Sequence, residues 1–314
     1  MEIFDRYIEI NGSRQNIMTM RTKTENPILL IVHGGAGLPD RPLVKEYSSE
    51  LAEYYTVVCW DQRGCGLSRT KGKLDIDTLL TDLKELVEYL RKEYNQDKIY
   101  IAGHSFGSYI ALRFTYMHPE YIEYYIGTGQ KVSAIEAEID KYNFLKAEAT
   151  KRNDKKVLQQ LEHFGEPEGN TYKNDNKKAK SFVLATLFKY SGYFSTNGPS
   201  MGKYLSQYSK LYSKTYGIHL PATLIGLVKS LIALNAEMDE TDMITPITEL
   251  KVPVLIIFGE EDMVCPKPTA KRWFDKLTAP KKEFIEIKNA SHMVNFEKAA
   301  EWNETVKSLL KENN

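Results

Sequence analysis

Three short, nearly continuous apolar runs in the first third of the chain constrain its fold more than any other feature of the sequence. They extend over Ile28 to His33, Thr56 to Asp61 and Lys98 to Gly103. Such runs are typical of central strands buried on both faces of a parallel sheet. Between the second and third runs, apolar residues recur at helical spacing: Leu79, Leu80, Leu83, Leu86, Val87 and Leu90. This alternation predicts an α/β fold, a mostly parallel twisted sheet flanked by helices.

The same alternation appears before and after these runs. Asn11-Gly12 separates two segments of alternating character and predicts a hairpin turn. Further strands are predicted at Ile122 to Gly127, Val254 to Phe258 and Glu283 to Ile287. Two more helices are predicted near the C-terminus, one near Thr269 to Leu277 and one striped by Ala299, Trp302, Val306 and Leu309.

The segment between these two blocks has a different character. From about residue 131 to residue 245 it is rich in Lys and Tyr, its stretches are amphipathic, and no run of parallel strands is evident. We therefore expect a helical lid inserted into the α/β core. The expected domains are residues 1–130 for the first part of the core, 131–245 for the lid and 246–314 for the second part of the core.

Composition and charge exclude several classes of function. Lys and Arg together number 42, and so do Asp and Glu, so no excess charge favours nucleic acid or an anionic membrane. Aliphatic stretches such as Ile28 to Val32 are far too short to span a bilayer, and the first ten residues lack a signal pattern. We therefore expect a small-molecule or short-peptide substrate, with neither nucleic acid nor a membrane as partner.

The cysteines indicate the compartment. Cys59, Cys65 and Cys265 are odd in number and lack the spacing of metal ligands, which suits a reducing environment better than a disulfide framework. We therefore predict a cytoplasmic protein with no metal and no cofactor. We expect it to be a monomer or a homodimer.

The most informative motif is Gly103-His104-Ser105-Phe106-Gly107, which has the form G-x-S-x-G. It follows a predicted strand and precedes a helical run over Tyr109 to Met117. In this context the motif places a nucleophile on a strained strand-to-helix turn. Glycines are required at either flank because side chains there would crowd the turn. Ser105 is therefore the predicted nucleophile.

Two further residues complete a predicted catalytic triad. Asp262 and His292 each follow one of the predicted strands in the second block. Together with Ser105 they come at the C-terminal ends of strands, which is the edge of an open α/β sheet where sites form. We predict that His292 transfers protons and that Asp262 orients it, with Glu260 or Glu261 as the alternative third member.

A glycine-rich loop after an earlier strand supplies another part of the predicted site. This loop is His33-Gly34-Gly35-Ala36-Gly37. Such a loop can direct a backbone N–H group at a substrate carbonyl oxygen, alongside the N–H of the residue after the nucleophile. Gly35 and Phe106 are therefore the predicted oxyanion-hole donors. We interpret His33 and His104, which flank the predicted site, as residues that make local hydrogen bonds.

At these motifs the chain resembles the α/β-hydrolase superfamily over nearly its whole length, and within it the proline iminopeptidase branch of serine peptidases. Trp60-Asp61-Gln62-Arg63-Gly64-Cys65-Gly66-Leu67-Ser68 is close to the D-Q-R-G-x-G-x-S stretch of that branch, and His33 to Gly37 resembles its H-G-G-P-G loop. Ala36 replaces the usual Pro, and Phe106 stands where Trp is common. The resemblance implies an α/β-hydrolase fold and an aminopeptidase that removes an N-terminal residue, often Pro, from small peptides.

The same resemblance implies that acidic side chains of the lid hold the free ammonium group of the substrate, since a desolvated ammonium needs such a partner. Glu237 and Asp239, near the end of the lid, are the first candidates. Further acidic residues at the two ends of the lid are Glu240, Asp242, Glu136 and Glu138. Surface helices carry such charges in any case.

The residues leave two other functions open. A carboxylesterase or related acyl hydrolase would use the same triad with an apolar lid pocket. The G-H-S-F-G elbow favours it, as do lid aromatics that can also simply pack: Tyr190, Tyr193, Tyr204 and Tyr208. A ligand-binding protein without turnover would require a broken triad, which the sequence does not have. Ser105 disfavours the branches of the superfamily that use a carboxylate nucleophile.

Overall fold

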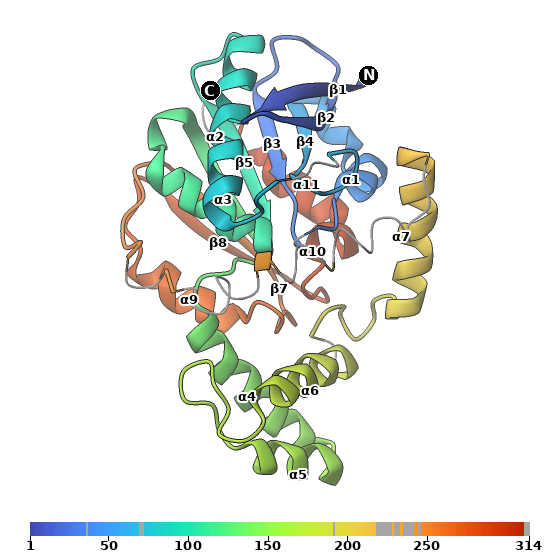
Figure 1. Cartoon of the computed structure of the whole chain (residues 1–314), viewed down its shortest axis with the longest axis vertical. Helices are drawn as coiled ribbons and strands as arrows, with labels where there is room; N and C mark the ends of the chain where they lie inside the picture. The colour runs from blue at the N-terminus through green and yellow to red at the C-terminus, as the bar shows by residue number, and fades with distance from the viewer. Residues whose placement is uncertain are drawn as a thin grey trace.

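The computed structural model describes residues 1–35, 37–68, 72–190, 192–217, 228, 233–234, 242–243 and 246–310 (Figure 1). Within these residues the centre of the molecule is an eight-stranded sheet of order β1-β2-β4-β3-β5-β6-β7-β8. The strands are β1 (Glu2–Ile10), β2 (Ser13–Arg21), β3 (Ile28–Val32), β4 (Thr56–Asp61), β5 (Ile99–His104), β6 (Ile122–Thr128), β7 (Val254–Gly259) and β8 (Lys282–Ile287). The β1–β2 and β2–β4 pairs are antiparallel, and every other neighbouring pair is parallel.

The sheet confirms the predicted strands, and burial explains why they could be recognised. Every residue of β3, β4, β5 and β7 is buried, which explains why these strands are largely apolar on both faces. The predicted hairpin is also confirmed. Asn11 and Gly12 have φ values of 47° and 65°, and Ile10 pairs with Ser13 across them. Such a two-residue turn needs positive φ at both positions, which Asn-Gly adopts readily.

Helices cover both faces of the sheet (Figure 1). On one face the apolar sides of α2 (Ile76–Glu93), α3 (Phe106–Met117) and α9 (Lys267–Lys276) join one hydrophobic core. On the other face α1 (Arg41–Tyr47), the short 3-10 helix η1 (Ser49–Glu53) and α11 (Ala299–Ser308) join a second. The remaining short core helices are η2 (Pro119–Tyr121) and α10 (Val294–Glu297). The predicted apolar stripe of α2 is buried in the first core, as its spacing requires.

Four helices of the described residues lie between β6 and β7 and form the predicted helical insertion: α4 (Ala134–Lys151), α5 (Lys155–Phe164), α6 (Asn176–Lys189) and α7 (Met201–Tyr216). The first three pack on one another around a small core of their own, with Leu145, Leu161 and Leu187 at its centre. Figure 1 shows these three helices projecting away from the sheet, at the bottom of the view. The predicted limits of the lid, residues 131 and 245, stay predictions.

The fourth helix of the insertion, α7, packs on the core domain instead. A tyrosine recurs at every fourth position and therefore lies on one face of this helix: Tyr204, Tyr208, Tyr212 and Tyr216. All four are buried in a cluster that includes Leu43 of α1. The lid therefore has two parts, a three-helix unit over the sheet edge and a helix fixed against α1.

The described part of the chain has no helix that is both long enough and apolar enough to cross a membrane.

Candidate active site

The predicted nucleophile lies on a strained turn between β5 and α3. Ser105 has φ 53° and ψ −120°, a backbone conformation that residues with a side chain rarely adopt. The flanking glycines allow it because the turn is tightly packed. A Cβ atom at Gly107 would overlap the carbonyl oxygen of Val32 in the neighbouring strand, and one at Gly103 would overlap the backbone of Gly107. The G-x-S-x-G pattern is thus required by close approach of main chain to main chain.

The structure brings Ser105, His292 and Asp262 together in one hydrogen-bonded chain. The Oγ atom of Ser105 lies 2.9 Å from Nε2 of His292, and Nδ1 of His292 lies 2.9 Å from Oδ2 of Asp262. They follow β5, β8 and β7, and these parallel strands end at the same edge of the sheet. His292 and Asp262 are both buried. Geometrically this is the arrangement of a nucleophile, a general base and a group that orients the base.

The Asp262 carboxylate is held by its own loop. Its Oδ1 atom accepts the backbone N–H groups of Val264 at 2.9 Å and Cys265 at 3.1 Å, which leaves Oδ2 directed at His292. The two alternative third members make other contacts. Glu261 accepts the backbone N–H of Thr196 at 2.8 Å, and Glu260 accepts that of Asn289 at 3.2 Å.

The two predicted oxyanion-hole residues lie beside the nucleophile. Gly35 and Phe106 line the same cavity as Ser105. Phe106 is the first residue of α3, where a backbone N–H has no partner within its own helix. Among the described residues, no backbone carbonyl accepts a hydrogen bond from the N–H of Gly35 or Phe106. Both groups are thus available to a carbonyl oxygen, and the N-terminus of α3 adds a partial positive charge.

A cavity of about 450 Å³ opens at Ser105 between the core and the lid. The lid side of its wall comes from α4 and α6, and the core side includes the loop that follows Asp262. Much of the lining is apolar: Val132, Ala134, Ala137, Val183, Leu184, Leu187, Val264 and Pro266. Glu138 brings a negative charge to it, and Lys131, Lys141 and Lys180 bring positive ones. The cavity can therefore hold a small molecule that has both an apolar part and a charged group.

Cys265 also lines this cavity, but its environment keeps the thiol protonated. Burial, helped by the nearby carboxylate of Asp262, raises the pKa of Cys265 to about 12. A thiol is a strong nucleophile only as the thiolate. Cys265 is therefore part of the wall and a poor competitor of Ser105.

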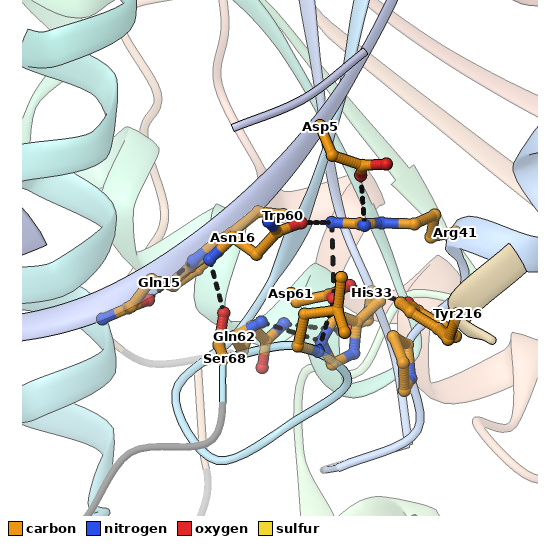
Figure 2. Close-up of polar contacts among 12 residues, drawn as sticks. Asp5, Gln15, Asn16, His33, Arg41, Trp60, Asp61, Gln62, Ser68 and Tyr216 are labelled. Carbon is orange, nitrogen blue, oxygen red and sulfur yellow. Dashed lines mark hydrogen bonds and ion pairs between the residues drawn. The ribbon is translucent and has the colours of Figure 1, made fainter. Parts of the chain in front are cut away.

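Figure 2 shows the contacts of Asp61, the first residue of the stretch Asp61-Gln62-Arg63-Gly64. Asp61 is fully buried, and its carboxylate accepts hydrogen bonds from the Leu67 backbone at 2.9 Å and the Tyr216 hydroxyl at 2.8 Å. The buried guanidinium of Arg41 lies 3.3 Å away and also contacts Asp5 and Asn16 of the N-terminal hairpin at 2.6 Å. Because a buried charge needs such partners, Asp61 joins its own loop, α1, the hairpin and the lid helix α7.

The next two residues of the stretch hold neighbouring parts of the site. The side chain of Gln62 donates to the backbone carbonyl of His33 at 2.9 Å, and its backbone N–H donates to Nε2 of His33 at 3.3 Å (Figure 2). Burial lowers the pKa of His33, so its ring stays neutral and can accept this bond. Arg63 forms two hydrogen bonds to the buried Asp82 of α2, at 2.7 and 2.8 Å. The stretch therefore fixes the start of the loop that carries Gly35.

The acidic residues predicted to bind the substrate amine differ in where they lie. Glu237, Asp239 and Glu240 lie outside the described residues. Asp242 forms an isolated backbone bridge with Ser133. At the other end of the lid, Glu136 pairs with Arg272 at 2.6 Å on the surface of the core, whereas Glu138 is buried and lines the cavity.

Sequence reasoning missed Tyr216, Arg41 and Asp40 as parts of the site. A regular tyrosine stripe predicts a packed helix face, and nothing in it distinguishes the one hydroxyl that meets Asp61. The local role expected for His104 is wrong, because its Nε2 atom lies 3.0 Å from the carbonyl oxygen of His292, a residue 188 positions away. The tyrosines considered for the substrate pocket are not among its lining residues.

The chain matches the α/β hydrolase fold family over residues 27–299. A Bacillus subtilis protein named "Probable aminopeptidase YbaC" is 29% identical over 92% of this chain and 91% of its own length. A proline iminopeptidase from Heyndrickxia coagulans is 24% identical over 94% of each chain.

Solved structures share the fold at lower identity. The proline iminopeptidase of Mycobacterium smegmatis superposes with a TM-score of 0.69 at 17% identity and covers 98% of each chain. A serine hydrolase involved in carbazole degradation has a TM-score of 0.69 at 16% identity and covers 99% of each chain. At these identities the likeness is one of fold alone.

The Asp61 contacts predict a specific effect on stability. Tyr216→Phe removes one hydrogen bond from a buried carboxylate, so the free energy of unfolding should fall by about 1–3 kcal/mol. Tyr204→Phe makes the same change on the same helix, and the described residues offer its hydroxyl no hydrogen-bond partner, so it should cost less than about 0.5 kcal/mol. Urea unfolding of both variants measures the difference. Equal effects would mean that Asp61 does not depend on Tyr216.

Proposed function

This chain belongs to the α/β hydrolase fold family, and we propose that it is a serine hydrolase, most specifically an aminopeptidase of proline iminopeptidase type. In this proposal it releases an N-terminal residue from small peptides. The observation that carries it is the set of hydrogen bonds that joins Ser105, His292 and Asp262. Ser105 lines a cavity whose wall also contains the buried lid carboxylate of Glu138. The names of the two relatives that match along nearly the whole chain support the aminopeptidase assignment.

The reaction follows from the positions of these groups. His292 takes the proton of the Ser105 hydroxyl as Oγ attacks the substrate carbonyl, and a tetrahedral intermediate forms. The N–H groups of Gly35 and Phe106 stabilise its oxyanion. His292 then gives the proton to the leaving amine as the C–N bond breaks, which leaves an acyl-enzyme on Ser105. Water, deprotonated by His292, hydrolyses this ester and restores the serine.

Asp262 acts through His292. It accepts the Nδ1–H of the imidazole, which leaves Nε2 with its lone pair toward Ser105. The ring becomes an imidazolium in each half of the reaction, and the buried carboxylate stabilises that charge.

Glu138 is the lid residue that we assign to the substrate ammonium. It is buried in the wall of the Ser105 cavity, and the Tyr172 hydroxyl fixes one of its oxygens at 3.0 Å. Its other oxygen has a long 3.4 Å contact to Lys141, a side chain that is still 20% exposed. A substrate ammonium can displace that contact, and a charged hydrogen bond within a closed cavity is stronger than one at the surface.

A carboxylesterase is the second candidate, and the apolar part of the same cavity favours it. Val183 and Leu187 of α6 face this space and would suit an acyl chain without any amine. The triad chemistry would be identical, so substrate preference is what separates the two functions.

The assignment predicts a clear order of substrates. We expect kcat/KM to be high for an unblocked proline arylamide, much lower for its N-acetylated twin, and abolished for both in Ser105→Ala. A short p-nitrophenyl ester is the third substrate. If it is turned over and the arylamides differ little, the protein is an esterase. If Ser105→Ala retains activity, the assignment of the nucleophile is wrong.

The role of Asp262 predicts a second effect. Asp262→Asn should lower kcat by about 10⁴-fold, because the amide holds the wrong tautomer of His292 while filling the same space. Steady-state rates at saturating substrate measure this. A loss of less than about tenfold would mean that another group orients His292.

The proposed role of Glu138 predicts a change in selectivity. Glu138→Gln should reduce kcat/KM for the unblocked arylamide by about 10- to 100-fold, as loss of a charged hydrogen bond requires, while ester turnover changes little. Glu136→Gln on the same helix is the matched control, because Glu136 pairs with Arg272 outside the cavity. Equal losses on both substrates, or an equal effect of Glu136→Gln, would contradict the assignment.

A further inference from the structure

We propose that Asp40 and His104 form a second, ionised carboxylate–imidazole pair that positions His292 and the oxyanion-hole loop. Both side chains are buried. Asp40 ends the loop that carries Gly35, and His104 directly precedes Ser105. The pair therefore lies where the nucleophile, the base and the oxyanion-hole loop meet. This inference rests on the serine hydrolase function proposed above.

The contact between His104 and His292 shows which nitrogen of the His104 ring carries a hydrogen. Nε2 of His104 lies 3.0 Å from the backbone carbonyl oxygen of His292. A carbonyl oxygen only accepts hydrogen bonds, so Nε2 must carry a hydrogen. This bond holds the backbone of His292, whereas Asp262 holds its side chain, and the two imidazole rings are 5.0 Å apart between their centroids. The position of the base therefore depends on His104 as well as on Asp262.

The contact between His104 and Asp40 indicates that Nδ1 of the His104 ring carries a second hydrogen. Nδ1 of His104 is buried without a hydrogen-bond partner among the described residues and faces Oδ2 of Asp40 at 3.7 Å. This separation is that of an ion pair. A neutral ring with its hydrogen on Nε2 would turn a lone pair toward the carboxylate, which is unfavourable. Burial by itself lowers the pKa of His104, but the facing carboxylate of Asp40 outweighs it and raises that pKa. Both contacts therefore favour the imidazolium form of the ring.

Asp40 also reaches the oxyanion-hole loop. Its Oδ2 atom accepts the backbone N–H of Gly34 at 3.5 Å. Gly34 packs directly on the elbow, because a Cβ atom there would lie 2.7 Å from the carbonyl oxygen of His104. The donor Gly35 is the next residue. One carboxylate thus connects the loop that would bind the oxyanion to the residue that precedes the nucleophile.

The net charge of the Asp40–His104 pair matters because His292 lies next to it. The titratable groups that act on it from neighbouring elements are Asp262, His292, His33, Cys59, Tyr193, Tyr204 and Tyr208. Burial keeps the Cys59 thiol protonated, because it raises its pKa. Burial raises the pKa of the three tyrosines, so they are uncharged. The neighbouring guanidinium of Arg41 pairs with Asp61. An intact Asp40–His104 pair therefore adds little net charge beside His292, whereas Asp40 alone would add a buried anion.

The test is the pH dependence of the rate at which a fluorophosphonate labels Ser105, since this rate follows the fraction of His292 that is neutral. His104→Gln keeps a donor for the His292 carbonyl but leaves Asp40 without a cation. The lone carboxylate favours the imidazolium form of His292, so the acid limb of the labelling rate should move up by about one pH unit. Adding Asp40→Asn removes the anion, and the limb should return to its wild-type position.

The outcomes separate the two proposals. Failure of wild-type protein to label would refute the serine hydrolase function itself. Normal wild-type labelling with an unmoved limb in His104→Gln, or a double variant in which the limb stays shifted, would refute the ionised pair alone. Should His104→Gln not fold, ¹⁵N NMR of the wild-type histidines decides. We expect one histidine that keeps both nitrogens protonated to a higher pH than an ordinary histidine and that loses this property in Asp40→Asn; its absence from the wild type would overturn the inference.

Discussion

The imidazole of His292 is held at both nitrogens, and the rest of the site depends on this double contact. Ser105 and Asp262 can meet it at 2.9 Å on either side only because β5, β7 and β8 run parallel and end at one edge of the sheet. The tight packing of β5 against β3 and α3 accompanies the strained conformation of Ser105, whose hydroxyl meets His292 at the wall of the cavity. The packed core thus fixes Ser105, and the loops after β7 and β8 supply Asp262 and His292.

The two parts of the lid make different contacts with the core and with the cavity. Helix α7 is fixed to the core through its tyrosine face and through the contact of Tyr216 with the Arg41–Asp61 pair. Helices α4 and α6 form the lid side of the cavity and bring Glu138 and the apolar residues to it. We infer that α7 supports the loops of the catalytic edge, whereas the three-helix unit selects the substrate. Changes in α4 or α6 should then alter specificity while the chemistry stays the same.

Much of the fold could be predicted from sequence, because the central strands are buried on both faces and are therefore largely apolar, with polar residues such as Asp61 and His104 at their C-terminal ends. Ser105, Asp262 and His292 could also be selected from sequence, since each lies in the turn or loop that follows a strand: β5, β7 and β8 end at His104, Gly259 and Ile287. The residues that support them could not. Asp40, His104 and Tyr216 act across long separations in the chain, and an acid, a histidine or a tyrosine leaves no periodic signal of its partner. The choice of Glu138 likewise depends on which turn of α4 faces the cavity.

The central claim is that Ser105 forms an acyl-enzyme through His292, and trapping that intermediate tests it most directly. Wild-type protein would be mixed with a p-nitrophenyl ester, quenched in acid within the first turnover and mapped by peptide mass spectrometry. Our account predicts one added acyl group on the peptide that contains Ser105, and no adduct in Ser105→Ala. An adduct on Cys265, or product release with no acylated residue, would contradict it.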